Sequence, residues 1–282
     1  MTPYPATDPR TNRPLPPDFL VAQRPEDYTD RDHRTWRTLL ERQSALLRGR
    51  AVDEFHVGLT ALGITPAGIP DFREMNRTLA RATGWSVVAV PGLVPDAVFF
   101  RHLAARRFPA GYWIRKPEQL DYIEEPDVFH DVFGHVPLLM QPRYADYMAE
   151  YGRAGLRLAE RPALANLARL YWYTVEFGLM QTAAGLRIFG AGIISSAGEA
   201  VYSLDSAEPA RVRFDTGRVL RTRYKIDDFQ RIYFVLSGYG DLPALTAAAL
   251  DGVIAAAQRQ DDIAPGQILD TDAIHAPPAD LH

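Results

Sequence analysis

Two histidines stand five residues apart in EEPDVFHDVFGHVPLL, residues 124 to 139, a segment that is otherwise largely apolar or acidic. Neutral imidazole is the commonest metal ligand in proteins, so His130 and His135 are candidate ligands. Zinc metalloproteases place two histidines four residues apart on one helical face, whereas five residues would separate the side chains by about 140° on a regular α-helix. Gly134 and Pro137 favour a helix that ends or loosens here, which would bring His135 back toward His130.

A third ligand is available in YWYTVEFGLM, where Glu176 is surrounded by aromatic and aliphatic residues. Burying a carboxylate alone is costly, so Glu176 is expected to meet a cation. Two histidines and one carboxylate form the ligand set of non-haem iron(II) oxygenases, which leaves positions open for oxygen and a co-substrate. Two alternatives stay open: a plain ion pair of Glu176 with Arg169, and a zinc hydrolase in which Asp131 replaces the usual glutamate base.

The composition bounds the remaining possibilities. A chain of 282 residues with 47% hydrophobic content can bury the core of one large domain. The net charge of −4 carries no block of like charge, so neither nucleic acid nor a membrane surface is an expected partner. The absence of cysteine excludes disulfides and thiolate sites, and with no apolar run typical of a signal peptide or membrane helix we expect a cytoplasmic protein.

The hydrophobic periodicity predicts a mainly α (α+β) fold, with a single helical domain and a few short strands. Seven prolines in the first 25 residues predict an extended or disordered arm. The expected boundaries are an arm at 1–28, a catalytic domain at 29–262 and a tail at 263–282. Helices are expected at 28–49, 52–63, 69–84, 95–108, 142–160, 162–185 and 242–258, strands at 85–92 and 111–116, and a hairpin at 210–220 around Thr216 and Gly217.

A resemblance to a known family rests on three motifs. In chain order they are EEPDVFHDVFGHVPLL, YWYTVEFGL and FGAGIISSAGE. The chain resembles the pterin-dependent aromatic amino acid hydroxylases, most of all the bacterial phenylalanine 4-hydroxylases, over residues 30 to 255. The resemblance implies a mainly helical domain around a mononuclear non-haem iron site. It also implies Fe(2+) and tetrahydrobiopterin, or a related reduced pterin, as cofactors.

The resemblance assigns roles residue by residue. His130, His135 and Glu176 would be the catalytic iron ligands. Arg115, in YWIRKPEQLDY, would bind the amino acid carboxylate through its forked guanidinium. The other residues that would bind the substrate are Trp172, Phe177 and Ser195. Those that would bind the pterin are Gly92, Leu93, Phe99 and Asp131.

The implied reaction is hydroxylation of L-phenylalanine to L-tyrosine with O2 and a tetrahydropterin. An apolar pocket around Trp172 and Phe177 would accept a phenyl ring and give no partner to a hydroxyl, which favours phenylalanine over tyrosine. Hydroxylation of another aromatic amino acid, such as tryptophan, is the main alternative, followed by the zinc hydrolase and by a metal-free binding domain. Because the chain lacks the heptad helix of animal members, a monomer is expected.

Overall fold

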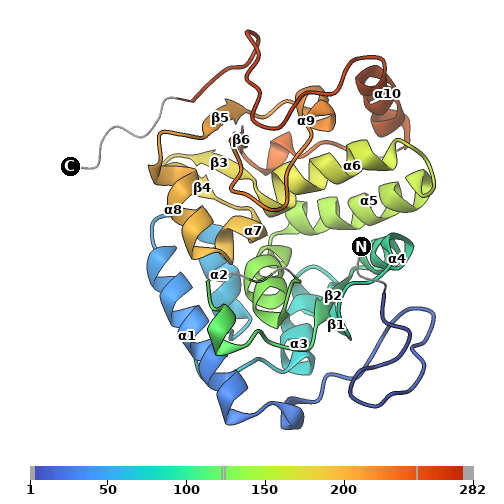
Figure 1. Cartoon of the computed structure of the whole chain (residues 1–282), viewed down its shortest axis with the longest axis vertical. Helices are drawn as coiled ribbons and strands as arrows, with labels where there is room; N and C mark the ends of the chain where they lie inside the picture. The colour runs from blue at the N-terminus through green and yellow to red at the C-terminus, as the bar shows by residue number, and fades with distance from the viewer. Residues whose placement is uncertain (1–3, 122, 124, 246, 276–282) are drawn as a thin grey trace. The chain divides into compact units, whose positions relative to one another are not determined.

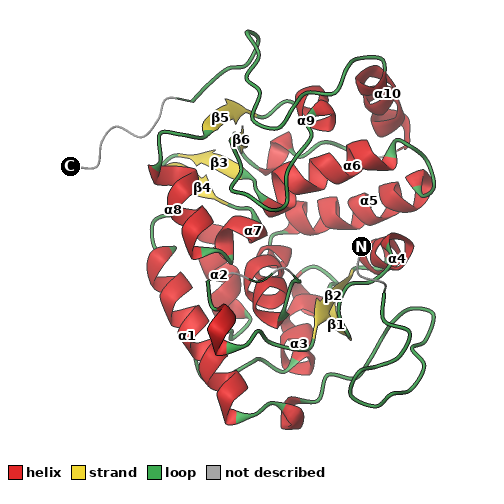
Figure 2. Ribbon diagram, in the orientation of Figure 1, coloured by secondary structure: helices red, strands yellow, loops and turns green. Residues whose placement is uncertain are grey.

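The computed structural model describes residues 4–121, 123, 125–245 and 247–275 (Figure 1). Internal contacts divide the chain into two compact units: residues 1–45 with 53–157, and residues 46–52 with 158–282. Helices dominate both units and the described strands are short (Figure 2), which confirms the predicted mainly α fold. Within the described ranges no helix is both long enough and apolar enough to cross a membrane.

The first unit contains most of the long helices. Its elements are η1 (Pro25–Asp27), α1 (Asp30–Leu46), α2 (Asp53–Ala61), α3 (Phe72–Ala82), β1 (Ser86–Val90), α4 (Asp96–Ala104), β2 (Arg107–Gly111), η2 (Pro117–Gln119), η3 (Phe129–His135), η4 (Val136–Met140) and α5 (Pro142–Leu158). Helix α3 shows how capping residues in the sequence mark the two ends of a helix. Asp71 accepts a hydrogen bond from the Arg73 N–H at its start, and Gly84 follows its end with a φ of 74°.

A two-stranded parallel sheet in this unit differs from the sequence prediction. Strand β1 falls inside the predicted range 85–92, but its partner β2 occupies 107–111 rather than the predicted 111–116. The predicted helix at 95–108 stops at Ala104 because Arg106 adopts a left-handed φ of 54° and its carbonyl accepts from the Ser86 N–H at 3.0 Å. Non-local pairing with β1 therefore overrides the local pattern around Pro109.

The described part of the proline-rich arm packs on the first unit. The Val21 N–H donates to the Ala89 carbonyl at 3.0 Å, which places the arm beside β1. The Arg10 guanidinium lies 3.7 Å from the centroid of the Tyr112 ring, a cation–π contact. Residues 4–24 contain no helix and are held by these individual contacts.

The second unit combines shorter helices with a sheet. Its elements are α6 (Leu164–Tyr171), η5 (Trp172–Glu176), β3 (Leu179–Thr182), β4 (Gly185–Ile188), α7 (Ala191–Ile194), α8 (Ala197–Asp205), β5 (Ala210–Arg213), α9 (Thr216–Arg221), β6 (Ile232–Leu236), η6 (Tyr239–Asp241) and α10 (Ala247–Gln258). The strand order is β4-β3-β6-β5, with an antiparallel β3–β4 hairpin and parallel pairing elsewhere. Strand β6 reads IYFVL and is buried throughout, as expected for a strand paired on both sides.

The predicted long helix at 162–185 is wrong in its second half. It ends at Glu176, and residues 179–182 form β3. A side chain at Gly178 would have its Cβ 2.1 Å from the Phe189 ring, and one at Gly190 would have its Cβ 2.3 Å from the Glu176 carbonyl oxygen. The chain turns where these two glycines permit close backbone approach, and pairing with β6 then fixes a strand.

The predicted hairpin at 210–220 is also wrong. Its first half is β5, but Thr216 and Gly217 begin helix α9, because the Asp215 carboxylate accepts from the Arg218 N–H at 2.8 Å and caps the helix. The predicted tail is described as far as residue 275, and residues 276–282 lie outside the described part. Within it, Ile274 pairs with Val212 at the edge of β5.

Candidate metal centre

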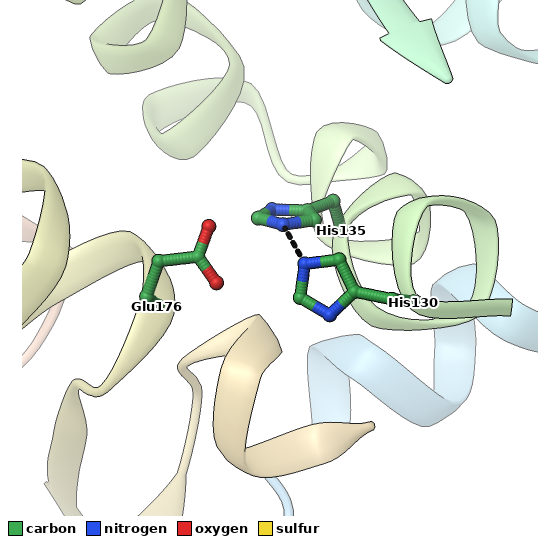
Figure 3. A group of neighbouring side chains, drawn as sticks. All are labelled: His130, His135 and Glu176. Carbon is green, nitrogen blue, oxygen red and sulfur yellow. Dashed lines mark hydrogen bonds between the residues drawn. The ribbon is translucent and has the colours of Figure 1, made fainter. Parts of the chain in front are cut away.

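The two histidines are brought together by a wide helix. Residues 129–135 form the π-helix η3, in which hydrogen bonds run from residue i to i+5, so positions five apart lie one above the other. The Nε2 atoms of His130 and His135 are 3.2 Å apart (Figure 3). The predicted loosening of the helix is therefore present, but as a continuous π-helix, and Pro137 belongs to the 3-10 helix η4 that follows.

Helix η3 is fixed by aromatic packing inside the first unit. Phe129 and Phe133 stack with ring centroids 4.7 Å apart, and both are fully buried. Trp36 from α1 packs edge-on against Phe129, and Phe55 from α2 packs edge-on against Phe133. Four fully buried rings thus hold the backbone that carries the two imidazoles.

Glu176 also ends a π-helix, η5, and its side chain is half-buried. Arg169, its alternative partner, instead directs both terminal nitrogens to the Asp262 carboxylate at 2.6 and 2.7 Å. One nitrogen of each of His130 and His135 and one oxygen of Glu176 all lie within 4.8 Å of one another (Figure 3). These contacts favour the ligand interpretation of Glu176 over the ion pair.

The donor set fits a transition metal. Ligand atoms about 2.1 Å from one metal ion and at roughly right angles to it are about 3 Å apart, close to the separation of the two imidazole nitrogens. Two imidazoles and a carboxylate match the set used by non-haem iron(II) oxygenases. Both His130 and His135 present Nε2, so the pair offers two equivalent donors.

Arg115 has a buried carboxylate partner that the sequence reasoning missed. Its Nε and Nη2 donate to the two Asp127 oxygens at 2.8 Å each, and its backbone N–H donates to Asp127 at 2.9 Å. Asp127 also accepts from the His130 N–H at 3.0 Å, at the start of η3. Burial opposes ionisation of Asp127, but hydrogen bonds and the charge of Arg115 hold its pKa below the usual range. Asp127 is one of three acidic residues in EEPDVFH, and nothing in the sequence distinguishes it for this role.

The residues predicted to bind pterin lie in the first unit. Asp131 is buried, and one of its oxygens accepts from the Gly111 N–H at 2.7 Å, which ties η3 to the end of β2. The Leu93 N–H donates to Glu125 at 3.3 Å, and a side chain at Gly92 would have its Cβ 2.5 Å from the same carboxylate. Phe99 lies in the first turns of α4 and is half-buried, with its ring edge-on to that of Phe100.

The residues predicted to bind substrate in the second unit are Trp172, Phe177 and Ser195. The Trp172 and Phe177 rings lie 4.6 Å apart at either end of η5. The Trp172 ring also stacks on that of Tyr224, with the ring centroids 4.3 Å apart. Ser195 is the residue at which the short helix α7 ends. Neither Tyr224 nor any other residue of the 224–229 segment was singled out from the sequence.

The family model for biopterin-dependent aromatic amino acid hydroxylases matches residues 23–245 of the chain. The chain therefore belongs to this family. A phenylalanine-4-hydroxylase of Ralstonia nicotianae is 56% identical over 260 residues, which cover 92% of this chain and 83% of that protein. One of Caulobacter vibrioides is 54% identical over 267 residues, covering 94% of this chain and 91% of that protein.

Solved structures agree with the sequence relatives. The phenylalanine hydroxylase of Chromobacterium violaceum with bound iron(III) and oxidised 7,8-dihydrobiopterin has a TM-score of 0.88 at 49% identity, covering 93% of this chain and 95% of that chain. The same relative with iron and phenylalanine bound has a TM-score of 0.86 at 50% identity, covering 92% and 94%. The chain therefore shares both its fold and about half of its residues with this relative, over more than nine tenths of its length.

Proposed function

We propose that this protein is a phenylalanine 4-monooxygenase, which hydroxylates L-phenylalanine to L-tyrosine with O2 and a reduced tetrahydropterin. The observation that carries the proposal is the pair of imidazoles on η3, whose Nε2 atoms are 3.2 Å apart, in a chain of this family. The relatives named phenylalanine-4-hydroxylase and the relative solved with iron and phenylalanine support the choice of substrate.

The ligand set would be His130, His135 and Glu176, and together with the pterin an iron(II) ion there would supply the oxygen-activating chemistry. The protein's own task is to hold these groups still. Asp127 fixes the start of η3 through the His130 N–H, and Asp131 fixes it to β2 through the Gly111 N–H. Both carboxylates are buried, so water competes little for these hydrogen bonds.

Arg115 would bind the substrate carboxylate. Asp127 occupies the Nε and one Nη of the guanidinium, and a guanidinium has five N–H groups in total, so donors remain for a second carboxylate. Arg115 is only 5% exposed, and its pairing with Asp127 holds the planar group in one orientation. Ser195 would bind the polar end of the substrate.

Trp172 and Phe177 would contact the aromatic ring of the substrate, and Gly92, Leu93, Phe99 and Asp131 would contact the pterin. Apolar rings at η5 give no partner to a substrate hydroxyl, and this favours phenylalanine over tyrosine. Tryptophan is the competing substrate, and a direct comparison of the two amino acids decides between them.

The test is an aerobic reaction of purified protein with phenylalanine, reduced pterin and ferrous iron, with tyrosine measured by chromatography. We expect tyrosine formation that requires all three additions. Replacement of iron by zinc should abolish it. Hydrolytic activity with zinc and no tyrosine with iron would instead establish the zinc hydrolase.

The ligand assignment has its own test. His130→Ala, His135→Ala and Glu176→Ala should each abolish tight iron binding, because three protein ligands become two, while the helical circular dichroism signal is retained. Iron is measured by calorimetric titration of the metal-free protein. Tight iron binding by Glu176→Ala would place the third ligand elsewhere.

The proposal includes a monomeric enzyme in the cytoplasm. A cysteine-free composition suits that reducing compartment. Light scattering of the purified protein tests the monomer, and fractionation of the producing cells tests the location.

A further inference from the structure

The side chain of Gln230 makes three hydrogen bonds in the second unit and is buried with 5% exposure. Its Oε1 accepts from the Trp172 indole N–H at 3.0 Å. Its Nε2 donates to the carbonyls of Lys225 and Asp228 at 3.0 and 3.2 Å. One amide therefore binds the indole N–H of Trp172 and also two backbone carbonyls of the preceding residues, 224–229. We call these residues the 224–229 loop.

The same loop covers a face of the indole. Tyr224 stacks on Trp172 with the two rings 12° from parallel. Phe177 packs near the same ring at 37°. Trp172 thus lies against Tyr224 and Phe177, with its N–H on Gln230, so a change in the loop would move the indole.

The backbone of Gln230 is fixed independently of its amide. Its N–H donates to Glu199 Oε1 at 3.1 Å, and the Tyr233 hydroxyl donates to the same oxygen. Glu199 is 4% exposed and lies on α8. Because the main chain is held this way, a substitution at Gln230 tests the side-chain amide with little effect on the path of the backbone.

We propose that Gln230 is a positioning residue that fixes the orientation of Trp172 and the closure of the 224–229 loop together, and so determines how well the substrate's aromatic ring fits. The inference rests on the proposed function, in which Trp172 contacts that ring. Glutamine suits the role because its amide has one oxygen acceptor and two N–H donors, and the indole N–H and the two carbonyls engage both kinds.

The decisive variant is Gln230→Met, which keeps the length of the side chain and removes all three hydrogen bonds. Its matched control is Asn166→Leu, also of similar size. Asn166 is 7% exposed in the same unit and donates to the Leu220 carbonyl at 2.8 Å. Both variants remove a buried amide, but only Gln230 contacts Trp172.

Two measurements are made on the full chain loaded with iron. The first is steady-state kinetics, in which Gln230→Met should raise KM for phenylalanine by about 2- to 10-fold, the effect of one neutral hydrogen bond, and leave KM for pterin unchanged. The second is fluorine NMR of protein labelled with 5-fluorotryptophan, with Trp172 assigned from Trp172→Phe. Its resonance should shift or broaden in Gln230→Met and stay in place in Asn166→Leu.

An unchanged Trp172 resonance with unchanged KM for phenylalanine would overturn the inference, as would equal changes in Asn166→Leu. If Gln230→Met does not fold, Gln230→Glu replaces it, since it keeps an oxygen for the indole but lacks the two amide donors to the loop; an unchanged KM there has the same meaning. The proposed function fails separately, when the unsubstituted protein forms no tyrosine.

Discussion

Asp127 links the proposed substrate-binding arginine, Arg115, to the first proposed metal ligand, His130. It accepts three hydrogen bonds from Arg115 and one from the His130 backbone, and its side chain is completely buried. One carboxylate thus positions both the arginine that we propose binds the amino acid and the start of the helix that carries the two imidazoles. Loss of its charge should affect both.

Asp127→Asn should destabilise the protein by about 3–5 kcal/mol, because Arg115 would remain buried without its counter-charge. It should also raise KM for phenylalanine, since the guanidinium is no longer held in one orientation. Urea unfolding measures the first effect and steady-state kinetics the second. The pKa of Asp127 is lowered by Arg115, so its stabilisation is present above the unfolded value of about 3.9 and is lost as pH falls through the folded pKa.

Glu118→Gln is the control for this substitution. Glu118 also pairs with an arginine, Arg31, but their side chains are 70% and 56% exposed. Surface pairs of this kind contribute about 0–1 kcal/mol. Equal effects of Asp127→Asn and Glu118→Gln on unfolding would contradict the role assigned to Asp127.

Residue types and spacing alone predicted the two histidines and Glu176 as a ligand set. Arg115 and the pterin residues came only from the family resemblance, because a strand arginine or a turn glycine has no distinctive pattern. Asp127 and Gln230 were missed, since their importance lies in partners that are distant or unremarkable in sequence. A role that depends on which atoms surround a side chain can be assigned only once the fold is known.

At the scale of elements, π-helices carry all three proposed ligands. Helix η3 presents His130 and His135, and η5 ends at Glu176. A π-helix is less stable than an α-helix, and its wider turn persists where packing holds it. For η3 that packing includes Phe55 of α2 against Phe133. Helix α2 also packs on η4, where a side chain at Gly58 would have its Cβ 2.1 Å from the Pro137 carbonyl oxygen.

Gly58→Ala should therefore push α2 away from η4, two residues beyond His135. We expect a loss of about 1–3 kcal/mol in unfolding free energy, typical of overpacking, and weaker iron binding. Gly252→Ala in α10 is the control, since nothing lies within 4 Å of its Cβ. It should stabilise by about 0.5–1 kcal/mol. Urea unfolding of both variants measures the change in stability, and iron titration measures the change in affinity. Unchanged iron affinity in Gly58→Ala would show that η3 does not depend on α2.

The elements predicted correctly have local causes. Helices α1, α2 and α3 follow from the residue pattern inside their own segments, and Asp71 caps α3. Strand β2 was misplaced because it is fixed by pairing with β1. Strand β3 was predicted as helix, although it pairs with the adjacent β4 and with the distant β6. The start of α9 was misread because Asp215 caps a helix at a Thr-Gly pair that also suits a turn.

At the scale of the whole molecule, arginine and aspartate pairs make the stability of the fold depend on pH. Asp127, Asp262 and Asp272 each have a pKa lowered by an arginine. Asp262 is largely exposed, so its pair is screened by water. Asp272 is different, since its side chain is 3% exposed and that of Arg218 is 7% exposed.

Asp272→Asn tests whether the C-terminal segment contributes to global stability. Burial opposes the charge of Asp272, but hydrogen bonds from Arg218 on α9 at 2.9 and 3.1 Å and from the Leu269 N–H lower its pKa. The substitution leaves the Arg218 guanidinium buried without its counter-charge, so we expect the unfolding free energy at pH 7 to fall by about 3–5 kcal/mol.

The same pair should make stability depend on pH. Because the folded pKa of Asp272 is lowered, its stabilising contribution is complete above about pH 3.9 and disappears as pH falls through the folded pKa. The variant should therefore lose less stability than the native protein on acidification. Urea unfolding at neutral and acid pH measures this. The exposed Asp270, two residues away, gives the control Asp270→Asn, and equal effects of the two substitutions would show that the buried pair of Asp272 and Arg218 adds no stability of its own.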